Sequence, residues 1–171
     1  ILMLVVPSIG KGMVDAQYAA INRIYPSWHA LFRSVDEETI LKLGAYHEIT
    51  NWGVRSDIGK LCEDGITAYM MYMDEAGCGL YNIHLKEGRL PKAENEIVVY
   101  EEMLQAIGEK AEIGAHVTLD YQVFRGTGLD LKQHKEFVVT GFLAGEENLE
   151  KNTYTTLHSK DFLVGEVHEN E

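Results

Sequence analysis

Hydrophobic residues recur along the chain with two spacings, one typical of helices and one typical of strands. Near the N-terminus apolar residues follow one another at intervals of three or four, which predicts a helix from Ile9 to Ile24. The positions are Ile9, Met13, Ala16, Ala20 and Ile24. The segment "SWHALFRSV", residues 27–35, alternates instead, with Trp28, Ala30 and Phe32 on one face. This alternation predicts a strand.

A short helix is expected next, over the segment "EETILKLG" (37–44). Asp36 precedes it as an N-cap, acidic residues fill its first turn, and Gly44 stands at its end. Two further strands are predicted at "YHEITNWGVRS" (46–56) and "GITAYMMYMD" (65–74). The pattern therefore predicts one strand-helix-strand unit between Ser27 and Asp57.

The second half of the chain has shorter strands separated by turns. After the apolar strand Ile97–Val99, "EEMLQAIGEK" (101–110) predicts a helix with its apolar side at Met103, Leu104 and Ile107 and a stop at Gly108.

The segment "GAHVTLDYQVF" (114–124) alternates through Val117, Leu119 and Tyr121 and predicts a strand. The glycine-rich turn "RGTGLD" joins it to a returning strand, "HKEFVVTGFLAG" (134–145). These strands indicate a small β-rich lobe, and the polar tail "VGEVHENE" (164–171) is expected to fray.

Composition limits the classes of partner. The 171 residues suit one domain, or one domain with two small lobes, and 46% hydrophobic and 25% charged residues are ordinary globular values. The net charge of -12 comes from 27 acidic against 15 basic residues. It argues against nucleic acid and against docking on anionic lipid, since both need clustered Lys and Arg.

Cys62 and Cys78 are too few for a disulfide scaffold, and the sequence leaves open whether they are bridged or free. The chain lacks the run of about 20 apolar residues that a membrane span needs. Its apolar start, "ILMLVVP", lacks the basic region of a signal peptide. It suits either a first strand or buried terminus, or the edge of a domain that follows a membrane helix in a longer parent protein.

Motifs for cofactors are incomplete. "SIGKGM" holds Lys11 between two glycines but lacks the first glycine and the hydroxyl residue of a phosphate loop. Seven histidines are present, yet His84, Cys62 and Cys78 have no ligand-pair spacing. His29, beside Trp28, is interpreted as a strand histidine that faces solvent. We therefore expect no cofactor and no metal ion.

Signals for nucleophilic catalysis are equally incomplete. Ser8 and Lys11 form a Ser-x-x-Lys match, but the companion motifs Ser-Asp-Asn and Lys-Thr-Gly are missing. The methionines of "YMMYMDEAG" could line a groove, although a buried strand explains them more simply. The sequence predicts no catalytic residue and no enzymatic activity, and it leaves the ligand-binding residues unknown.

The segment "LKEGRLPKAENEIVV", residues 85–99, passes quickly from a charged turn into an apolar strand. Gly88 allows a positive φ, and Pro91 fixes the chain and cannot donate to a sheet. Asn95 and Glu96 can accept from nearby backbone N–H groups. We interpret the segment as a rigid joint, with an ordinary turn as the alternative.

The same segment carries a family resemblance. The motifs Leu-x-x-Gly-Arg-x-Pro, Asn-Glu-Ile-Val, Gly-x-x-x-x-x-Gly-x-x-Val-x-Leu and Val-x-Gly follow one another in this order. This block resembles the extracytoplasmic (periplasmic core) domain of MacB-like, FtsX-like ABC transporter permeases, over about Ile9 to Leu143. The matching residues are Leu85, Gly88, Arg89, Pro91, Asn95, Glu96, Ile97, Val98, Gly108, Gly114, Val117, Leu119, Val139 and Gly141. The upstream "YPSWHALFRSVDEETILKL" also looks like the first strand-helix unit of Gram-positive relatives.

The resemblance implies an α+β fold with a porter-like αβ lobe of strand-helix-strand units and an inserted small β-rich lobe. We place these parts at 9–75 and 76–150, with an unassigned tail at 151–171, and see no second strand-helix-strand unit after Thr153.

It also implies a non-catalytic extracytoplasmic domain in the cell membrane. Its partners would be the parent's membrane helices, a cytoplasmic ABC ATPase and an extracytoplasmic protein or peptide, and a homodimer in the full transporter is compatible with it. The alternatives are a stand-alone binding or adaptor domain and a small hydrolase.

Overall fold

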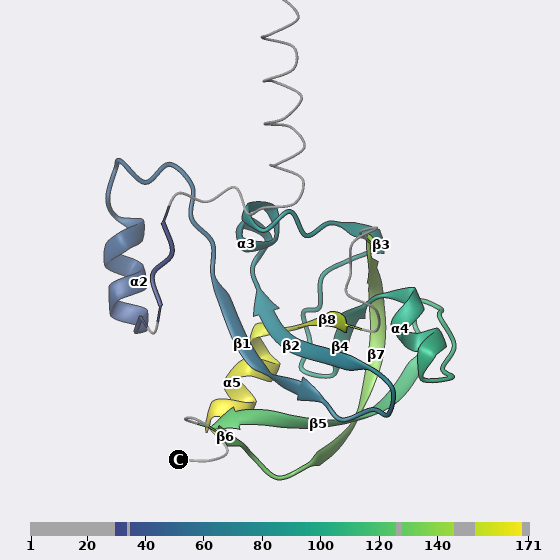
Figure 1. Cartoon of the computed structure of the whole chain (residues 1–171). Coiled ribbons are helices and arrows are strands. Elements are labelled where there is room, and N and C mark those ends of the chain that lie inside the picture. The colour runs from purple at the N-terminus through teal and green to yellow at the C-terminus, as the bar shows by residue number, and fades with distance from the viewer. Residues whose placement is uncertain (1–29, 34, 126–127, 146–152, 169–171) are drawn as a thin grey trace, which may run out of the picture. The chain divides into compact units, whose positions relative to one another are not determined.

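The computed structural model describes residues 30–33, 35–125, 128–145 and 153–168 (Figure 1). The chain divides into two compact units. Unit 1 consists of Ile1–Trp52 with Gly79–Asn82, and unit 2 of Gly53–Cys78 with Ile83–Glu171. The predicted helix at Ile9–Ile24 lies outside the described residues, as do the candidate positions Ser8, Lys11 and His29.

Unit 1 contains helix α2, Glu37–Gly44. Its predicted N-cap is confirmed, because Asp36 Oδ1 accepts a hydrogen bond from the backbone N–H of Thr39 at 2.8 Å. The helix ends at Gly44, as predicted, and the indole of Trp52 packs closely there. A Cβ atom at position 44 would lie 3.1 Å from that ring. Trp52 therefore covers the end of the helix.

The two strands predicted on either side of α2 are wrong. Residues 30–33 and 46–54 have no strand conformation, and the next strand begins only at Arg55. The predicted strand-helix-strand unit is therefore absent from the described part of 27–57. Alternation makes a strand only where a sheet partner buries one face, and here Phe32 is 57% exposed and Tyr46 60% exposed.

Unit 2 is built around a sheet with short helices. Its strands are β1 Arg55–Leu61, β2 Thr67–Met73, β3 Leu85–Gly88, β4 Glu96–Val99, β5 His116–Arg125, β6 Gly128–Leu129, β7 Gln133–Leu143 and β8 Thr153–His158. The helices are α3 Glu75–Leu80, whose last two residues belong to unit 1, α4 Glu101–Ala106 and α5 Lys160–His168. The predictions of β2, β4, α4, β5 and β7 are confirmed.

Six of the strands close into a ring. The order β1-β2-β8-β4-β7-β5 returns to β1, because β5 pairs with both β7 and β1. The pairs β2–β8 and β4–β7 are parallel, and the other four are antiparallel. β3 adds to β7 and β6 adds to β5, so β3 and β6 lie outside the ring. A closed ring leaves few strand edges open to water.

The predicted alternation of β5 is confirmed by its burial. Val117, Leu119, Tyr121 and Val123 are at most 4% exposed, and the residues between them are half-buried or exposed. β4 is buried more completely, since it lies between β7 and β8. On α4, Met103 and Leu104 face this core. The residues that alternate in the sequence are therefore those that fill the ring.

The C-terminal region differs from its prediction. The tail beginning at Val164 is expected to fray, but residues 160–168 form helix α5. The poorly assigned region from Thr153 onward forms β8 followed by α5. The ring of Phe162 is fully buried, and its centroid lies 5.7 Å from that of Tyr121. The helix was not predicted because the tail is mostly polar and Phe162 is the one aromatic anchor of α5.

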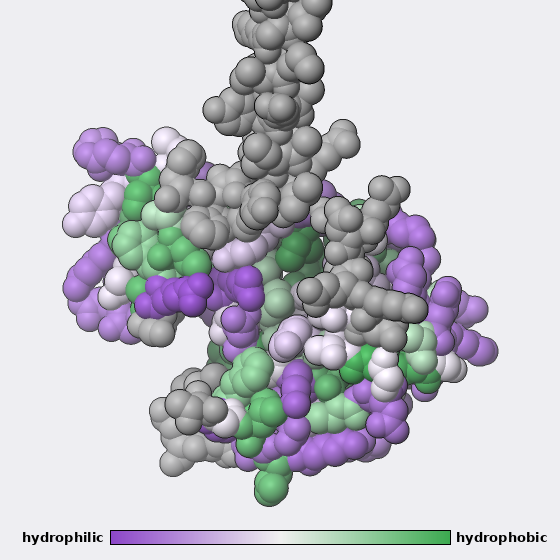
Figure 2. Space-filling view, viewed as in Figure 1, coloured by the Kyte–Doolittle hydropathy of each residue, from purple (hydrophilic) through white to green (hydrophobic). Residues whose placement is uncertain are grey.

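The structure has the α+β composition that the sequence predicts. Figure 2 shows hydrophilic residues over much of the visible surface, with apolar residues among them. The lobe boundaries remain predictions, and the β1–β5 pairing means that parts 9–75 and 76–150 share one sheet. Within the described residues, no helix combines the length and the hydropathy that a membrane span requires.

Candidate functional site

The segment singled out in the sequence forms a corner where the chain crosses β7. β3 pairs with β7 antiparallel, and β4 pairs with β7 parallel, so the two strands flank the same stretch of it. Gly141 is the register partner of Gly88 on β3 and of Val98 on β4. We call residues 88–97 together with Thr140 and Gly141 the Arg89–Glu96 corner.

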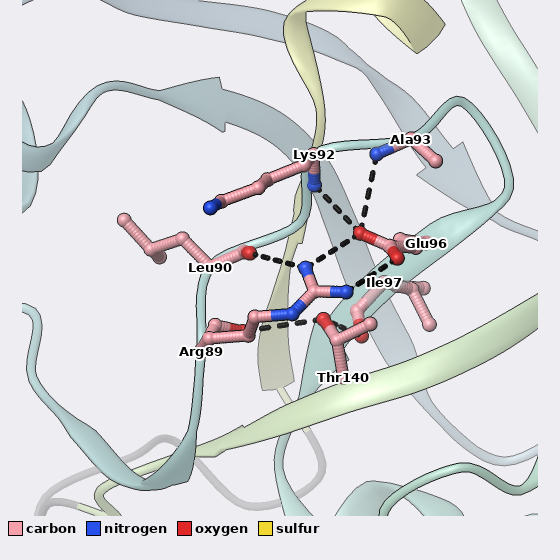
Figure 3. A network of polar contacts seen from close by, with 7 residues as sticks. All are labelled: Arg89, Leu90, Lys92, Ala93, Glu96, Ile97 and Thr140. Atoms are coloured by element: carbon pink, nitrogen blue, oxygen red, sulfur yellow. Dashed lines mark hydrogen bonds and ion pairs between the residues drawn. The ribbon is translucent and has the colours of Figure 1, made fainter.

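A two-pronged ion pair spans the corner (Figure 3). Arg89 Nη2 donates to Glu96 Oε1 at 2.6 Å, and Arg89 Nη1 donates to Glu96 Oε2 at 2.7 Å. Nη1 also donates to the carbonyl oxygen of Leu90 at 3.1 Å. The planar guanidinium matches the carboxylate in this geometry, which lysine cannot reproduce. The pair fixes the entry to the turn against its exit.

Glu96 also holds the backbone of the turn, as predicted. Its Oε2 accepts from the N–H groups of Lys92 at 2.7 Å and Ala93 at 3.1 Å. The hydrogen bonds from Arg89, followed by those two N–H groups, lower the pKa of Glu96 from 4.5 to about 2. Asn95 contributes through its backbone carbonyl, which accepts from Val138 N at 2.7 Å.

Thr140 joins the corner to β7 and was not identified from the sequence. Its hydroxyl donates to the carbonyl of Arg89 at 3.2 Å and lies 3.4 Å from the carbonyl of Ile97. The backbone N–H of Arg89 in turn donates to Thr140 O at 3.0 Å. The available signal was one hydroxyl residue within the apolar run "VVTGFL".

Gly88 has φ +85°, as its position before Arg89 predicts. A Cβ atom here would lie 2.5 Å from Gly141 Cα and nearer still to the carbonyl oxygen of Thr140. Gly141 is similarly crowded, because a Cβ atom there would lie 2.8 Å from Glu87 O. Both positions require glycine for close approach of the backbones.

The other residues of the resemblance also have structural roles. Gly108 and Gly114 have φ near +80° and +87°, in the turns on either side of residues 109–113. Five of the apolar members are at most 1% exposed, namely Ile97, Val98, Val117, Leu119 and Val139, while Leu85 is half-buried. The motif therefore describes how this part of the chain folds.

The chemistry available at the corner is that of a fixed turn. Glu96 is ionised at neutral pH and already accepts four hydrogen bonds, and Arg89 is permanently protonated. Neither group is poised to exchange a proton near pH 7. What the arrangement provides is a stiff connection between β3, β4 and β7.

A second polar group, also missed from the sequence, holds α5. The hydroxyl of Tyr121 lies 2.7 Å from Glu166 Oε1 and 3.0 Å from Gln133 Oε1. Gln133 Nε2 donates to Glu166 Oε2 at 3.3 Å, and Arg125 Nη2 donates to the Glu166 carbonyl at 2.7 Å. These residues come from β5, β7 and α5, so sequence spacing alone could not group them.

The remaining sequence candidates lie apart. Cys62 is half-buried and Cys78 is buried, and both are free thiols. Burial, followed by the charge of Asp74, raises the pKa of Cys78 to about 11, so this thiol is unreactive at neutral pH. The methionines of β2 are buried, as predicted for a core strand. No three His, Cys, Asp or Glu residues of the described ranges come together as metal ligands.

No family model matches the sequence, and no curated protein matches it. One similar solved structure is the extracellular domain of the noncanonic ABC-type transporter YknZ from Gram-positive bacteria, at 11% identity and a TM-score of 0.48. The match covers 80% of this chain and 67% of that one.

Another is a domain of a putative permease protein from Porphyromonas gingivalis, at 11% identity and a TM-score of 0.37. Here the match covers 64% of this chain and 50% of that one. The first is described as an ABC-type transporter domain and the second as a permease domain. At these identities and TM-scores the likeness identifies neither a shared ligand nor a shared activity.

Proposed function

We propose that this chain is a non-catalytic extracytoplasmic domain of an ABC transporter permease. The observation that carries the proposal is the Arg89–Glu96 corner. Motif residues from two separate segments, 88–97 and Gly141 on β7, meet there in one interlocked turn. Because these motif residues each have a role in building the turn, their match to the permease motif favours a shared architecture over chance similarity.

In this proposal the domain binds a substrate or a partner protein outside the membrane. Its movement is coupled, through the membrane helices of the parent protein, to ATP hydrolysis on a cytoplasmic ATPase. The corner acts as a rigid joint, because its ion pair and its backbone bonds resist changes in the angle between β3 and β4. The porter-like arrangement of the fold belongs to this proposal too.

The test is the position of the domain in intact cells. The complete parent gene is expressed with Cys62 replaced by Ser, because buried Cys78 does not compete. Leu131, which is 82% exposed, is changed to Cys as the reporter, and Leu119, which is fully buried, is changed to Cys as the matched control. A membrane-impermeant maleimide should label Leu131→Cys in intact cells and leave Leu119→Cys unlabelled.

The outcomes separate the proposal from its alternatives. Labelling in the membrane fraction, together with copurification of an ATPase, supports the permease domain. Labelled protein that is free of the membrane would indicate a stand-alone binding or adaptor domain. Labelling of Leu131→Cys only after lysis would contradict an extracytoplasmic position, and a hydrolase would then be sought by turnover assays.

A further inference from the structure

Helix α5 is attached to the sheet of unit 2 by a narrow row of side chains. Among its described side chains, Phe162 and Glu166 are the buried ones, at 0% and 7% exposure. They are four residues apart and so share one face of the helix. Both contact Tyr121 on β5, through the 5.7 Å ring pair and the 2.7 Å hydrogen bond. Phe162 and Glu166 are therefore the two buried side chains that anchor α5 to β5.

His158, at the end of β8, lies beneath this row. Its ring stacks on Phe162, with centroids 4.7 Å apart and planes 27° apart, and it meets the edge of Phe137 at 5.2 Å. The side chain is 1% exposed. Nε2 lies 3.0 Å from Thr156 Oγ1, while Nδ1 is buried without a hydrogen-bond partner in the described part of the chain. The site thus accepts a neutral imidazole.

The charged groups around His158 do not favour its protonation. From β7, Lys135 places its Nζ 5.1 Å from the centre of the Phe162 ring and pairs with Glu94. From α5, Glu166 is bound to Tyr121 and Gln133. From β8 itself, Thr156 offers a hydroxyl. Since no carboxylate of the described residues is bonded to His158, a proton on Nδ1 would create a buried cation without a counter-ion.

We propose that acidification releases α5 from the sheet, with His158 as the group that takes up the proton. A protonated His158 needs water at Nδ1, and the most direct route is for the stacked Phe162 to move away. Movement of Phe162 carries α5 with it and strains the remaining contacts at Glu166, which are its buried carboxylate and its carbonyl bonded to Arg125. A fall in pH thereby exposes Phe162 and Glu166 on α5 and His158 beneath them.

The expected size of the effect follows from proton linkage. Burial, and then the charge of Lys135, lower the pKa of His158 to about 3 when α5 is attached. Once exposed, the imidazole titrates near an ordinary value of 6.5. The detached form therefore binds protons first as the pH falls below that value. At about pH 5 the equilibrium for release should increase roughly 25-fold over its value at pH 7.

The experiment is hydrogen-deuterium exchange of the 171-residue chain at about pH 7 and pH 5, corrected for the intrinsic pH dependence of exchange. Peptides from 160–168 report α5, and peptides from β5 and β7 report unfolding of the sheet. His158→Gln keeps a donor for Thr156 but does not titrate. His134→Gln, at an exposed histidine paired with Asp120, is the matched control. Glu166→Gln removes the carboxylate of the other buried anchor.

Acid-dependent exchange confined to α5 is expected in the wild-type chain, in His134→Gln and in Glu166→Gln, and it should disappear in His158→Gln. Because the readout is the ratio between two pH values, it holds even where a variant loosens α5 at both. Three results would overturn the proposal. These are equal protection of α5 at both pH values, the same acid response in His158→Gln, and simultaneous loss of protection in α5, β5 and β7.

Discussion

At the scale of the residue, positive φ and close backbone contact restrict certain positions to glycine. Gly88 combines a positive φ with close contact to β7. Gly65 has nearly the same φ, +81°, but a Cβ atom there would have no neighbour within 4 Å. A substitution at Gly65 therefore measures the cost of backbone strain alone, and the same substitution at Gly88 adds the cost of crowding. A β-branched side chain at positive φ is strained at either site.

Gly88→Val should destabilise the domain more than Gly65→Val. Strain alone costs about 1–3 kcal/mol, and at Gly88 the backbones of Thr140 and Gly141 must also move apart. Urea melts at equal m-value measure both changes. Equal midpoints for the two variants would show that crowding at the corner is relieved without cost. An unchanged midpoint for Gly88→Val would mean that the segment is a pliable linker.

Glu96 should make stability depend on pH in the acid range. Its pKa is 4.5 in the ordinary state and about 2 in the fold. The stabilisation is thus complete above about pH 4.5, and it is lost as the pH falls towards 2. Glu96→Gln should cost about 1–2 kcal/mol at neutral pH, where it removes charge-assisted bonds. That difference should shrink as the pH approaches about 2.5.

Chemical denaturation of both proteins across this range gives the comparison. Glu38→Gln serves as the control, because Glu38 is 75% exposed and its pair with Lys42 is of the helix-surface kind. A difference between wild type and Glu96→Gln that stays constant with pH would contradict the assigned role of the carboxylate.

At the scale of the element, α3 exists because of one side chain. The sequence of α3, "EAGCGL", has two glycines and gives no periodic signal, so the helix was not predicted. Asp74 Oδ1 accepts from Gly77 N at 2.7 Å, which caps the helix, and from Val54 N at 3.0 Å, before β1. A local cap that also binds a segment 20 residues away cannot be recognised from sequence spacing.

Asp74→Ala should therefore destabilise two elements together. Loss of a cap typically costs about 1–2 kcal/mol, and here the N–H of Val54 loses its partner as well. Glu75→Ala, at the exposed neighbouring residue, should have an effect within about 0.5 kcal/mol. Thermal or urea melts give the totals, and amide exchange of residues 53–55 and 75–80 shows where the loss occurs. Protection in 53–55 that survives Asp74→Ala would contradict the link.

At the scale of the whole molecule, the sequence predicted elements better than their arrangement. β5 was recognisable because it alternates, and β7 because it returns after a glycine-rich turn, which are local signals. The parallel pairs β2–β8 and β4–β7 join distant segments and leave no such signal. In the corner, Gly88 was predicted from its backbone conformation and Glu96 from its ability to bind nearby N–H groups. The role of Thr140 depends on strand pairing that only the fold creates. The same holds for the Tyr121–Glu166 contact outside the corner.

The closed ring also imposes an order of assembly on the nascent chain. β8 is the last strand to be synthesised, yet it lies between β2 and β4, which are made much earlier. Until residues 153–158 emerge, β2 and β4 each have an unpaired edge that can join other chains. Ring closure is thus a late event of high contact order, which slows folding and prolongs the exposure of these edges. A chain that stops before β8 should aggregate, whatever the quality of its earlier strands.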